Sequence, residues 1–141
     1  MRISEILAED NVELDRIEDI IINTWNSVYP DVDVKVFEDD YIYVKAFENP
    51  HSDEADFTLA FGVYEPDEED PDFNIIVGWA YSGEYRGYIG KLFGKLFQWG
   101  KQKYPDAEQN LVVQMDKNPE AWSNMADKLG VNYLSEANQQ L

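Results

Sequence analysis

Apolar residues recur every three or four positions near the start of the chain, which predicts a helix from about residue 11 to residue 28. Asp10 or Asn11 could cap this helix, and Pro30 ends it. A shorter helix could precede it at residues 2–8. The apolar face of the longer helix holds Leu14, Ile17, Ile21, Trp25 and Val28.

After this helix, apolar and polar residues alternate, which is typical of strands. The segments V-D-V-K-V-F and Y-I-Y-V-K-A-F flank the short connection Glu38-Asp39-Asp40 and therefore predict a β-hairpin. The later run L-V-V-Q-M is almost continuously apolar, as expected for a buried strand. Strand patterns occupy residues 32–37, 41–47, 57–64, 73–81, 111–115 and 131–134.

Two further helices are predicted between the last three strands. The first covers about residues 87–104 and stops at Pro105. The second begins after a cap at Asn118 or Asp116 and ends at Gly130. Their inward faces are expected to hold Leu92, Phe93, Leu96 and Phe97 in the first helix, and Ala121, Trp122, Met125, Ala126 and Leu129 in the second.

This order of elements predicts an α+β fold with one mixed, mostly antiparallel sheet flanked by helices. A chain of 141 residues without a long linker is expected to form a single domain over residues 1–141, with residues 135–141 as a polar tail. Because a helix joins strand 73–81 to strand 111–115, the two should lie side by side in parallel. We expect them to diverge near Tyr81.

The junction between strand 73–81 and the following helix carries candidate chemistry. Its sequence, Y-S-G-E-Y-R-G-Y-I-G-K-L, predicts a strand end, a glycine-containing turn and a helix start. Such a turn directs backbone N–H groups and the positive end of a helix dipole at one point, which favours an anion such as phosphate. The donors would be the N–H groups of Arg86–Lys91, with Arg86, Lys91 and Lys95 as nearby cations. The alternative is a plain strand-to-helix connection whose glycines serve tight geometry.

Charge is distributed unevenly along the chain. Residues 1–85 hold 23 acidic and 4 basic residues, whereas residues 86–141 hold 6 and 7, so the first part accounts for the net charge of −18. This distribution argues against direct binding of nucleic acid. It suits a cationic substrate, a basic protein, or a DNA-binding protein whose DNA site the chain imitates. The alternative is a solvated acidic surface without a partner.

Missing residue types exclude several chemistries. The chain has no cysteine, which excludes disulfides and thiolate chemistry, and His51 is its single histidine, so we expect no metal site and no histidine-based triad. No run approaches the roughly 20 apolar residues that span a membrane, and the N-terminus lacks the apolar core of a secretory signal. We therefore expect a cytoplasmic protein that does not bind membranes.

Two segments within about residues 74–134 resemble the GNAT superfamily of acyl-CoA N-acyltransferases. In that family a [Q/R]-x-x-G-x-[G/A] loop wraps the CoA pyrophosphate, and E-Y-R-G-Y-I-G-K-L is similar to the common form Y-R-G-x-G-I-G-x-x-L with one residue missing. The middle glycine has no counterpart, so the loop could present fewer N–H groups to a pyrophosphate. The matching positions are Arg86, Gly87, Ile89, Gly90 and Leu92.

The second segment, N-P-E-A-W-S-N-M-A-D-K-L-G-V, is similar to the family's N-x-x-A helix that ends in K-L-G-F, with one extra residue between the halves. The family's usual general-acid tyrosine stands four residues after the alanine. This chain has Met125 there, and methionine cannot donate a proton. The resemblance therefore supports the fold more than it supports activity. The matching positions are Asn118, Ala121, Lys128, Leu129 and Gly130.

The resemblance implies transfer of an acetyl group from acetyl-CoA to an amine. Backbone at Ala80–Ser82 is the candidate for polarising the thioester carbonyl, and Glu84 and Tyr81 are candidates for deprotonating the amine. Tyr104 and Tyr133 are candidate acids, and each tyrosine could instead be a packing residue. The implied cofactor contacts are Ala80, Ser82, Arg86, Gly87, Tyr88, Ile89, Gly90, Lys91 and Asn118. The last of these could instead serve as a helix cap, and Trp122 is expected in the core.

The first residues carry a second resemblance. The sequence M-R-I-S-E-I-L-A-E is similar to the short capsid-targeting leaders of internal head proteins in large tailed phages, which a maturation protease cuts after an apolar-x-Glu signal. Ile3-Ser4-Glu5 and Leu7-Ala8-Glu9 both fit this signal. Residues 1–10 are therefore either a cleaved leader or an ordinary peripheral helix.

Three functions remain open from these patterns. The first is an acyltransferase whose acidic half attracts a cationic amine acceptor. The second is a catalytically inactive phage protein with a GNAT-like fold, which binds and inhibits a basic or DNA-binding host protein in the host cytoplasm, by DNA mimicry in one version. The third is a component packaged in the virion. Binding of CoA would separate the first function from the other two.

Overall fold

The computed structural model describes residues 11–115 and 117–135 of the chain. The helix predicted at residues 2–8, the leader at residues 1–10 and all but the first residue of the predicted tail lie outside these described residues. The described elements are α2 (Asn11–Val28), β1 (Asp33–Glu38), β2 (Ile42–Phe47), β3 (Phe57–Tyr64), β4 (Phe73–Tyr81), the short 3-10 helix η1 (Gly83–Tyr85), α3 (Arg86–Lys103), β5 (Gln109–Val113), α4 (Pro119–Leu129) and β6 (Asn132–Ser135).

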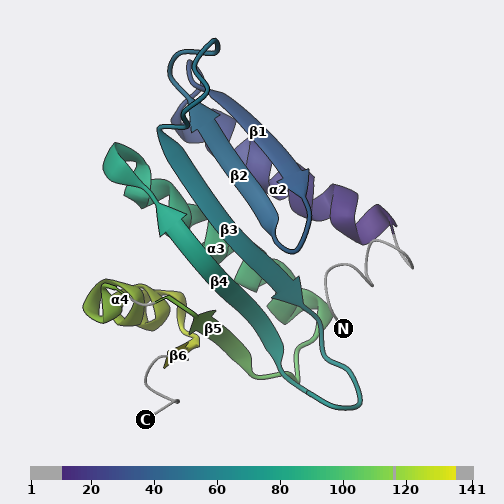
Figure 1. Ribbon diagram of the computed structural model, residues 1–141. Coiled ribbons are helices and arrows are strands. Elements are labelled where there is room, and N and C mark those ends of the chain that lie inside the picture. The colour runs from purple at the N-terminus through teal and green to yellow at the C-terminus, as the bar shows by residue number, and fades with distance from the viewer. Residues whose placement is uncertain (1–10, 116, 136–141) are drawn as a thin grey trace.

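The strands form one mixed sheet in the order β1-β2-β3-β4-β5-β6 (Figure 1). Neighbouring strands from β1 to β4 are antiparallel, whereas β5 is parallel to β4 and β6 is parallel to β5. With helices flanking this sheet, the predicted α+β class and the parallel pairing of β5 with β4 are confirmed. The strand predicted at residues 111–115 lies at Gln109–Val113, so Met115 is outside it and 58% exposed.

Helices α2 and α3 lie together against one face of the sheet, behind it in the view of Figure 1. From α3, the ring of Phe93 meets Phe61 of β3 with centroids 5.5 Å apart, and Phe97 meets Phe73 of β4 at 6.0 Å. Burial of the predicted inward face of this helix is confirmed. The fully or almost fully buried residues are Leu92, Phe93, Leu96 and Phe97.

An aromatic cluster around Trp25 fixes the start of α3 against α2. The indole N–H of Trp25 donates to the carbonyl of Val32 at 2.9 Å, and the hydroxyl of Tyr88 donates to the carbonyl of Ile21 at 2.8 Å. Burial raises the pKa of Tyr88. Four rings lie 4.8–5.4 Å from that of Trp25, centroid to centroid: Tyr29, Phe57, Tyr85 and Tyr88.

Helix α4 shows how fully local sequence signals can define an element. The side chain of Asn118 accepts a hydrogen bond from the N–H of Ala121 at 3.4 Å, and Pro119 occupies the first turn. Gly130 ends the helix in the left-handed region, with φ of 69°, where glycine is favoured. The predicted cap and both ends of this helix are therefore confirmed.

Candidate functional site

β4 and β5 are paired along only part of β4. The paired positions run from Phe73 and Gln109 to Val77 and Val113, and the N–H of Gln114 then donates to the carbonyl of Val77 at 2.9 Å. β4 continues to Tyr81, whereas the chain after β5 leads away to α4. The expected divergence of these two strands is therefore present, and it begins just after Val77.

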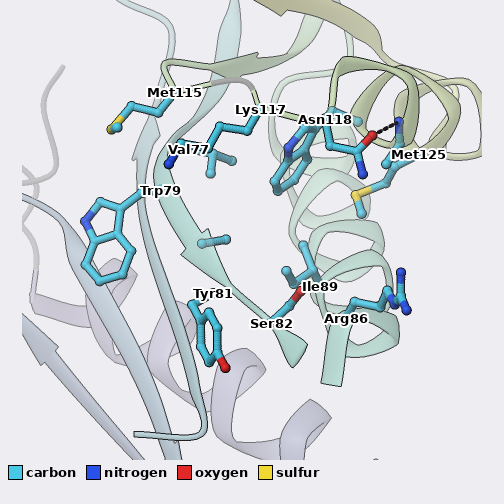
Figure 2. A pocket seen from close by; sticks show the side chains of 13 residues that line it. Val77, Trp79, Tyr81, Ser82, Arg86, Ile89, Met115, Lys117, Asn118 and Met125 are labelled. Atoms are coloured by element: carbon cyan, nitrogen blue, oxygen red, sulfur yellow. Dashed lines mark hydrogen bonds between the residues drawn. The ribbon is translucent and has the colours of Figure 1, made fainter. Parts of the chain in front are cut away.

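A pocket of about 730 Å³ lies where the two strands diverge (Figure 2). Its deepest residues are Val77 of β4 and Ile89 of α3, which are almost fully buried. The residues that line it are Val77, Trp79, Ala80, Tyr81, Ser82, Arg86, Ile89, Met115, Lys117, Asn118, Ala121, Trp122 and Met125. The pocket thus joins the end of β4, the start of α3, the segment after β5 and the start of α4.

The start of α4 forms one wall of the pocket. Asn118 both caps this helix and lines the pocket. Ala121 and Trp122 were expected to point inward to the core, but Ala121 is exposed and Trp122 is half-buried, and both line the pocket. The i, i+3, i+4 pattern groups residues of one helix face correctly, but it cannot tell whether that face meets a core or a cavity.

The start of α3 forms the opposite wall. The expected glycine-containing turn is the 3-10 helix η1, in which Gly83 has φ of 49° and the N–H of Tyr85 donates to the carbonyl of Ser82 at 2.8 Å. No side chain caps the start of α3, and its first turn holds no acidic residue. In a helix that begins at Arg86, N–H groups from Ile89 onward bond within the helix. Only first-turn donors therefore remain for an anion.

The ionic character of the pocket differs from that of the protein. Arg86 and Lys117 both line it, and its described lining residues include no carboxylate. The chain as a whole carries a net charge of −18. A local pair of cations beside an uncapped helix start, in so acidic a protein, favours an anionic ligand.

The side of the pocket away from α3 is aromatic and apolar. Trp79 is 40% exposed and Tyr81 is 62% exposed. Figure 2 shows these two side chains and Met115 on one side of β4, with Ile89, Arg86 and Met125 on the other. The pocket therefore reaches both faces of the sheet through the gap between β4 and the chain after β5.

A β-bulge explains why Trp79 lies on that side. Val77 pairs with Phe61, but Trp79 pairs with Ala60, so β4 has one extra residue, Gly78, at this point. Side chains of a regular strand alternate, which would place Trp79 on the same face as Val77. The extra residue reverses the alternation, so that Trp79 and Tyr81 face away from α3 and Ala80 faces toward it.

Three carboxylates lie close to the η1 end of the pocket without lining it. The hydroxyl of Tyr85 donates to Glu48, and this hydrogen bond, burial and the charges of Glu48, Asp56 and Glu84 raise the pKa of Tyr85. Asp56 accepts a hydrogen bond from the N–H of Glu48 at 2.7 Å. Two of the three carboxylates are therefore engaged in holding the loop between β2 and β3.

The residues predicted from sequence are only partly brought together. The six that line the pocket are Ala80, Tyr81, Ser82, Arg86, Ile89 and Asn118. Gly87, Gly90 and Lys91 lie on α3 outside the lining, and Glu84 is exposed on η1. The side chain of Tyr88 points into the core, so only its backbone could meet a ligand. Tyr104 donates its hydroxyl to Glu65, and Tyr133 is half-buried in β6; neither lines the pocket.

Sequence reasoning did not assign Val77, Trp79, Met115, Lys117, Ala121, Trp122 or Met125 to a binding site. For Lys117 a signal was present, since it directly precedes the predicted helix cap. For Trp79 the only signal was the adjacent glycine, because a bulge depends on the partner strand.

Comparison of the chain with protein-family models, with curated protein sequences and with solved structures gives no match. Within the described part of the chain, no helix is both long enough and apolar enough to cross a bilayer. Those same residues include no group of three or more histidine and acidic side chains that could hold a metal ion. The function must therefore be inferred from the geometry of the pocket.

Proposed function

We propose that the protein is a GNAT-like N-acyltransferase that transfers an acetyl group from acetyl-CoA to an amine. One observation carries the proposal: β4 and β5 diverge into a pocket that has two cations, no carboxylate among its described lining residues, and an uncapped helix start. The match of Arg86, Gly87 and Ile89 to the GNAT loop supports it. The local order of strand, helix, parallel strand, helix is also the one that the resemblance implies.

The two walls suggest how the cofactor would lie. Its phosphates would meet Arg86, Lys117 and the first-turn N–H groups of α3, because donors and dipole there favour negative charge. Past Val77, β5 no longer accompanies β4, so backbone groups on that edge of β4 face the pocket. The pantetheine arm would bond to them as an added strand would. Val77 and Ile89 give the thioester an apolar floor.

The reaction needs little from side chains. A backbone N–H at Ala80–Ser82 polarises the thioester carbonyl, and the neutral amine attacks its carbon. A C–N bond forms and the C–S bond breaks. The amine gives up one proton, and the leaving thiolate takes up one, so that the products are an amide and free CoA. Tyr81 lines the open side of the pocket and would carry a proton to solvent, whereas Glu84 lies outside the lining.

A second candidate is an inactive scaffold that binds a ligand or a partner without catalysis. The observation that favours it is that Met125, which cannot exchange a proton, lines the pocket, and that Tyr81, Arg86 and Lys117 are the ionisable groups among its described lining residues. The acidic first half would then bind a basic host protein, and a phage origin or packaging in a virion belongs to this candidate. A cytoplasmic location is proposed under either candidate.

Calorimetric titration with acetyl-CoA tests the first candidate against the second. The parent protein should bind, and Arg86→Ala with Lys117→Ala should weaken binding at least tenfold, which is about 1.4 kcal/mol. The matched control is Lys91→Ala with Lys95→Ala, which makes the same change in charge on exposed α3 positions outside the lining and should change affinity less than about threefold. Absence of heat for the parent protein at millimolar acetyl-CoA would contradict acyl transfer and favour the inactive scaffold.

A further inference from the structure

Exposed large apolar side chains are concentrated at the mouth of the pocket. Among the described residues, five large apolar side chains are exposed: Phe37, Trp79, Tyr81, Met115 and Leu134. Three of these, Trp79, Tyr81 and Met115, line the pocket. A soluble protein seldom gathers such side chains at one opening unless they meet a ligand.

The bulge at Gly78 sets the direction in which this mouth opens. It turns Trp79 and Tyr81 to the face of the sheet away from α3, where their partners across the strand pair are Ala60 and Thr58. Both partners are small and buried, which leaves the flanking rings to shape the surface. An acceptor that reaches the thioester through the gap from this face would therefore cross two aromatic rings first.

The charges around the mouth argue against an acceptor with several positive charges. Lys45 pairs with Thr58, which pairs with Tyr81, so this lysine lies on the same face and in the same cross-strand row. Lys35 lies opposite Lys45 on β1. Arg86 and Lys117 occupy the far side of the pocket. A polyamine would meet these four cations and, among the described lining residues, no carboxylate.

The acidic residues that dominate the first half of the chain do not change this balance. The densest acidic run, in residues 65–72, connects β3 to the start of β4, at the opposite end of that strand from Tyr81 (Figure 1). Of the three carboxylates near η1, Glu48 and Asp56 accept hydrogen bonds from the protein itself. One exposed carboxylate, Glu84, is left to attract a single ammonium group.

From these observations we infer that the acceptor is an arylalkylamine, a primary amine joined by a short linker to a planar apolar ring. The inference rests on the proposed acyl transfer and names its acceptor. The ring stacks on Trp79 and Tyr81, since aromatic pairs gain energy beyond the area they bury. The linker passes through the gap beside Met115, and the amine reaches the thioester over Val77. A ring without a second charge avoids the surrounding lysines.

Two measurements with phenethylamine, butylamine and spermidine test this inference. The first is saturation-transfer NMR without acetyl-CoA, in which phenethylamine should receive magnetisation from the protein and butylamine and spermidine should not. The second is release of free CoA thiol with acetyl-CoA present, in which kcat/KM for phenethylamine should exceed that for the other amines at least tenfold.

The matched variants are Trp79→Ala and Phe37→Ala, which each remove an exposed ring from the same face of the sheet. Trp79→Ala should lower kcat/KM for phenethylamine about tenfold, chiefly through KM, and leave butylamine within about threefold. Phe37→Ala should change neither amine, because Phe37 does not line the pocket. Far-UV circular dichroism confirms that both variants are folded.

The outcomes separate the two levels of the hypothesis. Turnover of butylamine or spermidine as fast as phenethylamine, or absence of saturation transfer to phenethylamine, overturns the aromatic acceptor and leaves acyl transfer standing. Absence of acetyl-CoA binding overturns acyl transfer, and the acceptor inference falls with it.

Discussion

The ring of Tyr41 lies directly over Gly78, so closely that a Cβ atom at Gly78 would come within 2.7 Å of its Cζ atom. The hydroxyl of Tyr41 donates to the side-chain carbonyl of Gln114, the residue whose N–H makes the hydrogen bond to Val77 at the point of divergence. Tyr41 therefore spans from β2 to the end of β5 across the bulge. The glycine makes room both for the bulge and for the side chain that secures it.

Gly78→Ala should consequently destabilise the protein by about 1–3 kcal/mol, because the added methyl must displace Tyr41 and disturb its hydrogen bond to Gln114. Urea unfolding followed by circular dichroism measures this. The control is Gly87→Ala, where a Cβ would meet nothing within 4 Å and alanine favours the helix, so stability should stay equal or rise by up to about 1 kcal/mol. Equal destabilisation by both substitutions would contradict the role given to Tyr41.

Leu96→Ala should lower the free energy of unfolding by about 2–5 kcal/mol, since Leu96 is fully buried between α3 and the sheet. Lys95→Ala, at the neighbouring exposed position, should change it by less than about 0.5 kcal/mol. Chemical denaturation of the two variants gives the comparison. A loss below about 0.5 kcal/mol for Leu96→Ala would mean that α3 does not pack on the sheet through this face.

A carboxyl pair between α2 and β1 makes stability depend on pH in an unusual direction. Burial, a hydrogen bond from Glu18 and the negative charges of Glu18 and Asp15 raise the pKa of Glu38 to about 7. The folded state then binds its proton more tightly than the unfolded state does. The stabilisation is present at low pH and is lost as pH rises from about 4.5 through 7.

Glu38→Gln keeps a hydrogen-bonding group at this position and removes the titration. Relative to the parent protein, the variant should gain stability on the order of 1 kcal/mol between pH 5 and pH 8, a value discounted because Glu38 is partly exposed. Urea unfolding of both proteins across this range measures the difference. Glu54→Gln, at an exposed loop position, is the control and should follow the parent. A parallel pH dependence of the parent and Glu38→Gln would refute the shared proton.

The sequence predicts α4 almost completely and β5 less well, for a physical reason. Helix ends are set by nearby residues, such as Asn118 and Gly130, whose signals are local. The polar start of β5 was missed because Asn110 is buried only through distant partners: its amide N–H₂ donates to Asn74 at 2.8 Å and its oxygen accepts from Asn132 at 2.9 Å. Burial of a polar residue depends on such pairing, which apolar periodicity does not report.

The candidate site divides in the same way. Arg86 and Asn118 were found because each belongs to a local motif at a helix start. Trp79 was not found, because its direction depends on a bulge against β3, and Met115 was placed in a strand that ends at Val113. Side chains that gather only after two segments diverge have no signature in either segment alone.

The central claim is that an acyl-CoA binds between β4 and β5 beyond Val77, and amide NMR of the ¹⁵N-labelled protein during titration with CoA tests it most directly. We predict chemical-shift changes concentrated in residues 79–88 and 114–122, with the acidic loop at residues 65–72 unchanged. No change in the first two segments at millimolar CoA, or changes confined to the β1–β2 hairpin or the acidic loop, would contradict the claim.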